Sequence, residues 1–306
     1  MEIVVPGSVA NLGGGFDTLG VAVQLYLRAR IVDVRDDGAG KLSVGTSRPA
    51  VSGPNAIERA YAHMVVKTGW RAPSVVVDVE SDIPMAAGLG SSAAASVAGL
   101  RIFEQVTRPF ANATLTESAL LAAATALEGH GDNAAAAICG GLTSVVEASD
   151  TPPVIVRWDW PQELKLVVAT PDVGLATSKA RAALPDALPR ADAVFNLQRV
   201  LSLVHALQRG DYGRLRQAVE DRWHQPARRA LVPQLADAMA IDDPDVLGAF
   251  LSGAGPSVAV LATSNLAKVK GLLERVYQGA GCPAIVRILD VHQSVGVAST
   301  TSGRSV

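Results

Sequence analysis

The sequence has no surplus of basic residues. Its 306 residues include 27 Lys and Arg against 29 Asp and Glu, so the formal net charge is −2. Proteins that neutralise a run of phosphates need such a surplus, and no basic stripe with interleaved aromatics is present, so we do not expect a nucleic acid partner. Charged residues make up only 18% of the chain and hydrophobic ones 49%. Disorder needs the opposite balance, and the chain is expected to fold around sizeable cores, as two lobes or one large domain.

Cysteines and unbroken apolar runs are also scarce. Cys139 and Cys282 are too few for a disulfide framework and lack metal-ligand spacing, so we expect buried thiols in a reducing compartment. The longest uncharged stretch, residues 83–100, is interrupted by Pro84, three glycines and three serines, which argues against a membrane span. Glu2 stands where a signal peptide would carry positive charge. We therefore expect a cytoplasmic protein without a membrane partner.

Several catalytic signatures are missing. The five histidines show neither metal-ligand spacing nor a triad pattern, and the sequence contains no G-x-S-x-G or H-E-x-x-H. The P-loop motif is absent too, because Gly40 and Lys41 are followed by Leu42 where Ser or Thr is required. The sequence therefore gives no motif that would indicate a hydrolase.

Glycine, serine and alanine gather instead in four charge-poor loops, at residues 6–17, 83–94, 128–133 and 251–257. Residue patterns around these loops predict strands at 2–5, 21–34, 74–79, 142–146, 164–169, 248–251, 258–261 and 284–289. They predict helices at 55–67, 91–106, 114–127, 191–208, 213–222, 233–240 and 266–277, the third opening on the capping-box spacing of Thr114 and Glu117. Strands and helices that do not strictly alternate indicate an α+β fold with two lobes.

The second loop has the form of an anion site. A glycine-rich turn that feeds a helix presents free N–H groups and a positive dipole end, and Gly88 and Gly90 allow close approach of a phosphate. A bound triphosphate would need magnesium, for which Ser92 offers a hydroxyl and Glu128 a carboxylate. Glu128 is alternatively a solvated residue at a helix end.

Taken together, the four loops resemble those of the GHMP kinases. The central motif, Pro84 to Ala94 (PMAAGLGSSAA), is similar to the family's ATP-phosphate loop, and the resemblance covers nearly the whole chain. It implies ATP and Mg²⁺ as cofactors, a homodimer, and a two-lobed fold whose N-terminal lobe is like domain 2 of ribosomal protein S5 and whose C-terminal lobe is ferredoxin-like. The implied boundaries are 1–152 for the ATP-binding lobe, 153–298 for the second lobe and 299–306 for a frayed tail.

Other segments resemble the branch of this family that acts on homoserine. These are ANLGGGFDTLG at 10–20, EGHGDN at 128–133, TSKAR with LP at 177–185, HQPAR at 224–228 and FLSGAGPS at 250–257. The implied activity is ATP-dependent phosphorylation of the hydroxyl of L-homoserine. The alternatives are a GHMP kinase for another hydroxy acid or a sugar, and a non-catalytic relative that binds a ligand.

The resemblance also assigns roles to residues. It places the substrate-binding residues at Asn11, Asp17, His130, Asp132, Arg181 and Arg228. It places the nucleotide at Asn55, Pro84, Met85, Ala86, Ala87, Gly88, Leu89, Gly90, Ser91, Ser92, Ala93 and Ala94, and the metal ion at Ser92 and Glu128. The catalytic set is Ser92, Glu128, Asn133 and Thr177, with Thr177 orienting the phosphate. Asn133 is an amide that cannot take a proton, so no dedicated base is expected.

The sequence departs from the family pattern at five positions. Gly14, Gly131 and Ala136 replace prolines, Ala86 replaces a glycine, and Ala227 stands where an aromatic residue is usual. Ala86 is the most serious departure if a positive φ is required there. None of the five removes a polar group that is assigned to chemistry.

Overall fold

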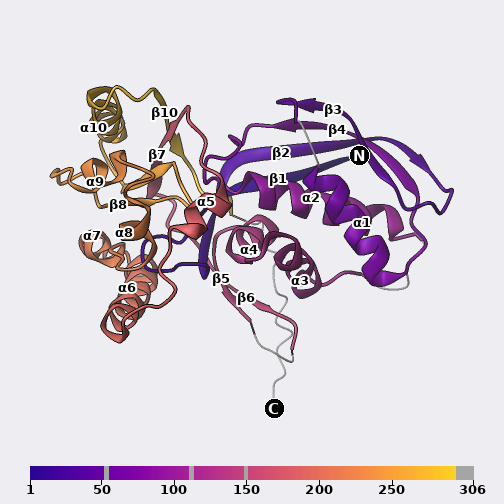
Figure 1. The fold of residues 1–306 in the computed structure, drawn as a ribbon, viewed down its shortest axis with the longest axis horizontal. Coiled ribbons are helices and arrows are strands. Elements are labelled where there is room, and N and C mark those ends of the chain that lie inside the picture. The colour runs from indigo at the N-terminus through magenta and orange to yellow at the C-terminus, as the bar shows by residue number, and fades with distance from the viewer. Residues whose placement is uncertain (52–54, 110–113, 148–150, 294–306) are drawn as a thin grey trace, which may run out of the picture.

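A computed structural model describes residues 1–51, 55–109, 114–147 and 151–293. The chain forms two lobes that lie side by side, each built on its own sheet (Figure 1). This confirms the α+β class and the two-lobed fold. The expected tail at 299–306 falls outside the described residues.

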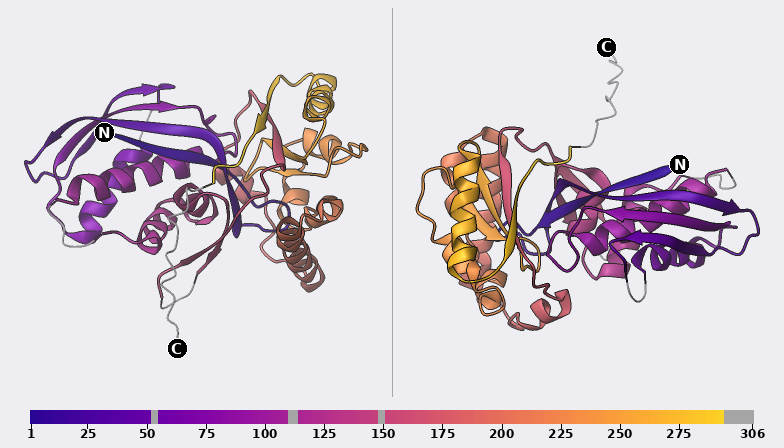
Figure 2. Two further views of the ribbon diagram at one scale, coloured as in Figure 1. Left: turned by 180° about the vertical axis from the view of Figure 1, so that it is seen from behind. Right: turned by 90° about the horizontal axis from the view of Figure 1, so that it is seen from above.

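The first lobe is a six-stranded sheet with four helices on one face (Figures 1 and 2). The strands run in the order β3-β4-β2-β5-β6, β1 pairs with β2, and all pairs are antiparallel except β3 with β4. Their bounds are β1 Glu2–Ala10, β2 Leu19–Arg35, β3 Leu42–Arg48, β4 Ser74–Ser81, β5 Leu142–Val146 and β6 Val154–Trp158, and those of the helices are α1 Ala56–Thr68, α2 Ser91–Thr107, α3 Glu117–Glu128 and α4 Asp132–Cys139.

The second lobe is a four-stranded antiparallel sheet in the order β10-β7-β9-β8. Its strands are β7 Lys165–Pro171, β8 Gly248–Leu251, β9 Val258–Ala262 and β10 Ala284–Leu289. Its helices are α5 Thr177–Ala182, α6 Arg190–Arg209, η1 Tyr212–Arg214, α7 Leu215–Ala218, α8 His224–Arg228, α9 Gln234–Met239 and α10 Leu266–Gly279. After β10 the chain returns to the first sheet, where Val291 bridges to Val23 of β2.

The two helices that begin at glycine-rich loops, α2 and α4, are packed into the core of the first lobe. Helix α2 packs on β1 and β2 and buries residues all along its length, including Leu100, Ile102 and Phe103. Helix α4 lies against β1, β2 and β5 and is buried almost completely, so its N-terminal residues Asp132 and Asn133 are held in a fixed place.

The structure corrects several expectations. The second lobe was expected to begin at residue 153, but Val154–Trp158 forms β6, an edge strand of the first sheet. Helix α3 begins at Glu117 with Thr116 as its cap, because the Thr116 hydroxyl accepts the Ala119 N–H at 3.1 Å. The helix expected at 213–222 is two short pieces, η1 and α7. Of the two thiols, Cys139 is buried and Cys282 is half-buried. No helix in the described ranges is long and apolar enough to cross a membrane.

Candidate active site

The four glycine-rich loops meet at one cavity between the lobes. Its volume is about 110 Å³, several times the ~10–15 Å³ that a single water needs. The first lobe contributes Asn11, Phe16, Asp17, Ala86, Ala87, Gly88, Gly90, Ser91, Ser92, Ala93, Glu128, His130, Asp132 and Asn133, and the second contributes Thr177, Arg181, Arg228, Gly253 and Ala254. Loops that are far apart in the sequence thus form a single polar site.

The glycine-rich turn before α2 is held in place by backbone contacts with both lobes. The Ser8 N–H donates to the Leu89 carbonyl at 3.0 Å, and the Ser252 hydroxyl donates to the Gly88 carbonyl at 2.7 Å. Gly88 has a φ of +72°, and a Cβ there would collide with the Ser252 and Gly255 carbonyls. Gly90 caps α2 with a φ of +71° and no side-chain hydrogen bond, which leaves the first N–H groups of the helix without a side-chain cap. This is the geometry of an anion site.

Ala86 adopts the conformation for which its family position carries glycine. Its φ is +52°, in the left-handed region that costs an L-residue about 1–2 kcal/mol. Its carbonyl accepts the Leu175 N–H at 2.9 Å, a bond to the segment that precedes α5. The departure noted in the sequence therefore leaves the shape of the turn intact at a cost in strain.

Two serines of α2 meet the carboxylate at the end of α3. Ser92 and Ser96 both donate to Oε1 of Glu128, at 3.0 and 2.6 Å. A hydroxyl oxygen and a carboxylate placed together beside a helix N-terminus are the oxygen ligands that Mg²⁺ prefers. The residues present thus fit a magnesium ion at this wall of the cavity.

A buried cluster also lines the cavity, at the start of α4. His130 Nδ1 donates to Asp132 Oδ1 at 2.6 Å, and the Asn133 N–H donates to the same oxygen at 2.8 Å. Burial by itself would lower the pKa of His130, but the hydrogen bond and charge of Asp132 raise it above its usual value. The Ser8 hydroxyl donates to Asn133 Oδ1 at 2.9 Å, so the amide can only donate from its free side.

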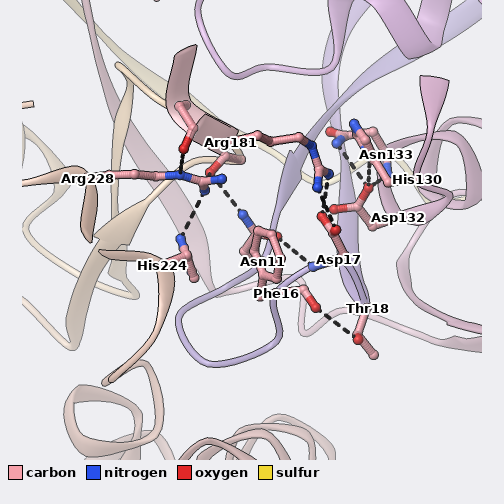
Figure 3. A network of polar contacts seen from close by, with 12 residues as sticks. Asn11, Phe16, Asp17, Thr18, His130, Asp132, Asn133, Arg181, His224 and Arg228 are labelled. Atoms are coloured by element: carbon pink, nitrogen blue, oxygen red, sulfur yellow. Dashed lines mark hydrogen bonds and ion pairs between the residues drawn. The ribbon is translucent and has the colours of Figure 1, made fainter. Parts of the chain in front are cut away.

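Asp17 and Arg181 join the two lobes across the cavity (Figure 3). The Arg181 guanidinium donates to both oxygens of Asp17, at 2.9 and 2.7 Å. Asn11 supports the pair: its Oδ1 accepts the Asp17 N–H at 3.1 Å, and its amide donates to the Gly253 carbonyl at 2.9 Å. Asp17, His130 and Asp132 also lie close enough together to ligate a metal ion, which the spacing of the histidines in the sequence did not indicate. Arg181 donates to both oxygens of Asp17, so this carboxylate is already paired and its negative charge is already offset.

Arg228 is buried beside them. It is 1% exposed, and it donates to the Ala180 carbonyl at 3.1 Å and to the Gly253 carbonyl and His224 Nδ1 at 3.2 Å each. Burial and then the charge of Arg181 lower the pKa of Arg228 to about 10. His224 Nε2 donates to the Gly13 carbonyl at 2.8 Å while its Nδ1 accepts from Arg228, and burial lowers the pKa of His224. His224 thereby fixes Arg228 to the loop that carries Asp17 (Figure 3).

Some residues expected in the site lie elsewhere. Asn55 caps α1, where its side chain accepts the Ile57 N–H, and it does not line the cavity. Pro84 and Met85 line a separate cavity with Thr170 and Arg287. Leu89 and Ala94 are buried in the first core. These four residues of the turn and helix therefore shape the site without lining it.

Several further residues contribute to the site without a local sequence pattern that marks them. Phe16 has the guanidinium groups of Arg181 and Arg228 at 5.6 and 5.3 Å from its ring centre. Ser8 and Ser96 act through hydrogen bonds that no local pattern reveals. Phe16 and His224 stood inside the motifs that carried the resemblance, and that was the one available signal for them.

Comparison with known proteins places this site in a family. Residues 55–141 match the GHMP kinases N terminal domain, and residues 203–279 match the GHMP kinases C terminal family. A homoserine kinase of Solibacter usitatus is 36% identical over 280 residues, covering 90% of each chain, and one of a Nostoc species is 36% identical over 305 residues, covering 95% of this chain and 97% of the other.

Solved structures show the same fold. The crystal structure of homoserine kinase from Cytophaga hutchinsonii superposes with a TM-score of 0.80 at 26% identity, covering 96% of this chain and 95% of that one. A mevalonate kinase of L. major, solved in complex with R-mevalonate, superposes with a TM-score of 0.67 at 19% identity and covers 97% of both chains.

Proposed function

Because the chain belongs to the GHMP kinase family and matches homoserine kinases over most of its length, we propose that it transfers the γ-phosphoryl group of ATP to the hydroxyl of L-homoserine. The observation that carries the proposal is one cavity in which Asp17, Arg181 and Arg228 face the glycine-rich turn. An amino acid brings an ammonium and a carboxylate, and this set of opposite charges can receive both. A sugar carries neither charge and would give Arg228 no carboxylate to bind.

ATP is the phosphate donor in this family, and the turn before α2 is the proposed place for its phosphates. The N–H groups of α2 after Gly90 and the hydroxyl of Ser91 meet the phosphate oxygens there, which explains how a chain of net charge −2 binds a highly charged nucleotide. Ser92 and Glu128 would hold Mg²⁺, which would offset the negative charge of the phosphates when bound.

The acceptor lies across the cavity from the phosphates. Asp17, Asp132 and His130 surround its ammonium, and Arg181 and Arg228 take its carboxylate, for which a guanidinium offers a bidentate fork. Asn133 accepts from Ser8 through Oδ1 and donates to Asp132 Oδ1 at 3.3 Å through its NH₂ group, whose second N–H remains as a donor, and it cannot accept a proton. Thr177 at the start of α5 orients the transferred phosphate. Transfer proceeds by positioning and electrostatics without a dedicated base, as the loose transition state allows.

Three broader assignments belong to the same proposal. The lobe boundary lies between β6 and β7, after the point expected at 152, because β6 pairs in the first sheet. The family resemblance supports a homodimer, which light scattering on the purified protein would test. Use of ATP supports the expected cytoplasmic location.

The catalytic proposal is tested by measuring MgATP-dependent ADP release with homoserine, threonine, mevalonate, shikimate and galactose as separate acceptors.

A further inference from the structure

Ser96 hydrogen bonds in a way that differs from two other hydroxyls on helices of the first lobe. Thr107, also on α2, donates to the Phe103 carbonyl four residues earlier, and Thr68 on α1 does the same to Met64. That local bond is a common choice for a hydroxyl inside a helix. Ser96 instead donates at 2.6 Å to Glu128, on another helix. The Ser96 hydroxyl therefore contacts the Glu128 carboxylate and not the backbone of its own helix.

Both serine hydroxyls reach the same atom of that carboxylate. Ser92 and Ser96 are four residues apart on one face of α2, and each donates to Oε1 of Glu128. Among the described residues none donates to Oε2. One oxygen of Glu128 is therefore held by the protein, and the other keeps its lone pairs for a ligand.

The two serines differ in exposure. Ser92 lines the cavity, whereas Ser96 is 1% exposed and does not line it, so Ser96 itself is out of reach of a nucleotide or a metal ion. Glu128 ends α3, where the negative end of the helix dipole disfavours a carboxylate, and hydroxyl donors offset that charge. A donor behind a metal-binding carboxylate also fixes its direction.

We propose that Ser96 is a positioning residue for Glu128: by holding Oε1 it keeps Oε2 directed to the divalent cation of the bound nucleotide. The inference rests on the metal role proposed above for Glu128. A competing explanation is that Ser96 only ties α3 to α2. That explanation predicts a loss of stability with no change in metal affinity.

The test is a titration of Mn²⁺ into ADP-saturated protein, in which free Mn²⁺ is followed by its electron paramagnetic resonance signal. Ser96→Ala is expected to weaken Mn²⁺ binding by about 10–100-fold, the usual effect of losing a partner behind a ligand. Ser96→Cys, of nearly native size but a weak donor, is expected to show the same loss, and Ser96→Thr, which keeps the hydroxyl, to restore binding. Thr107→Val is the control, because it removes a buried hydroxyl from the same helix far from the cavity.

The outcomes separate this inference from the proposed function. Wild-type Mn²⁺ affinity in folded Ser96→Ala or Ser96→Cys would overturn the positioning role, even if homoserine is phosphorylated normally. Weaker Mn²⁺ binding in both variants supports the role even if homoserine is not the acceptor. Equal losses in Ser96→Ala and Thr107→Val would assign the effect to stability and overturn the proposal.

Discussion

The Arg181 guanidinium and the Asp17 carboxylate form a bidentate ion pair across the cavity between the lobes. Its two hydrogen bonds join Nη1 to Oδ2 at 2.9 Å and Nη2 to Oδ1 at 2.7 Å. The two charges satisfy each other in this structure. A zwitterionic substrate can replace both halves of the pair, because its carboxylate can bind Arg181 while its ammonium binds Asp17. The pair therefore consists of the same kind of ammonium-type and carboxylate contacts that we propose for homoserine.

Arg181→Lys should weaken homoserine binding. A lysine ammonium is a single point charge and cannot reproduce the bidentate fork. We expect the KM for homoserine to rise about tenfold or more, with a smaller change in the KM for ATP. Steady-state kinetics with each substrate varied in turn provide the measurement. Arg30→Lys, on the exposed face of β2, is the control, and an equal effect in both variants would contradict the assignment.

Glu128→Gln should lower kcat strongly. The amide keeps the size of the side chain but removes the charge that we assign to magnesium, and losses of about 100-fold or more are expected for such a group. His63→Gln, on α1, should change kcat little, since His63 does not line the cavity. Comparable losses in the two variants would rule out the magnesium role.

The His130–Asp132 pair should make stability depend on pH. The pKa of His130 is raised in the folded protein, so the folded state binds the proton more tightly than the unfolded chain does. The resulting stabilisation is full below the ordinary pKa of 6.5 and is lost as the pH rises through the raised value. Urea unfolding at pH 5.5 and 8.5 should show a larger advantage of the wild type over His130→Asn at the lower pH. A larger stability advantage of the wild type at pH 8.5 would contradict the raised pKa of His130.

Gly88→Ala should be much more damaging than Gly69→Ala. Both glycines have a positive φ, +72° and +64°, but a Cβ at Gly88 would strike two carbonyls of the second lobe whereas one at Gly69 has nothing within 4 Å. We expect a loss of more than about 2 kcal/mol at Gly88 and about 1 kcal/mol at Gly69. Urea unfolding measures both, and ADP binding should fall in the first variant alone. Equal losses would show that the contact with the second lobe does not matter.

Local sequence chemistry predicted the elements that have local signals. The start of α2 at Ser91 follows from a glycine-rich turn that enters an alanine-rich helix, and the Thr116 cap was missed by two residues because Thr114 has an equally good spacing. Strand β6 was missed because its exposed residues, Val154 and Val156, are as apolar as the inward-facing Ile155, so the sequence shows no alternation of apolar and polar residues.

The site residues that lie farthest apart in the sequence could be predicted only from the family resemblance. Arg181 and Arg228 carry no local mark that separates them from surface arginines, and only the fold brings them to Asp17. Ser8 is 125 residues from Asn133, and Ser96 is 32 from Glu128, so neither hydrogen bond can be derived from spacing. Asn55, whose family position suggests the nucleotide, caps α1 with its side chain, and its role toward the nucleotide stays a prediction.

The most direct test of the central claim is the rate of MgATP-dependent ADP release by the purified protein with homoserine as acceptor. We expect turnover of homoserine well above the rate without acceptor and above the rates with mevalonate, shikimate and galactose. Formation of O-phosphohomoserine, identified by mass spectrometry, should match the ADP released. A homoserine rate equal to the rate without acceptor would contradict the claim.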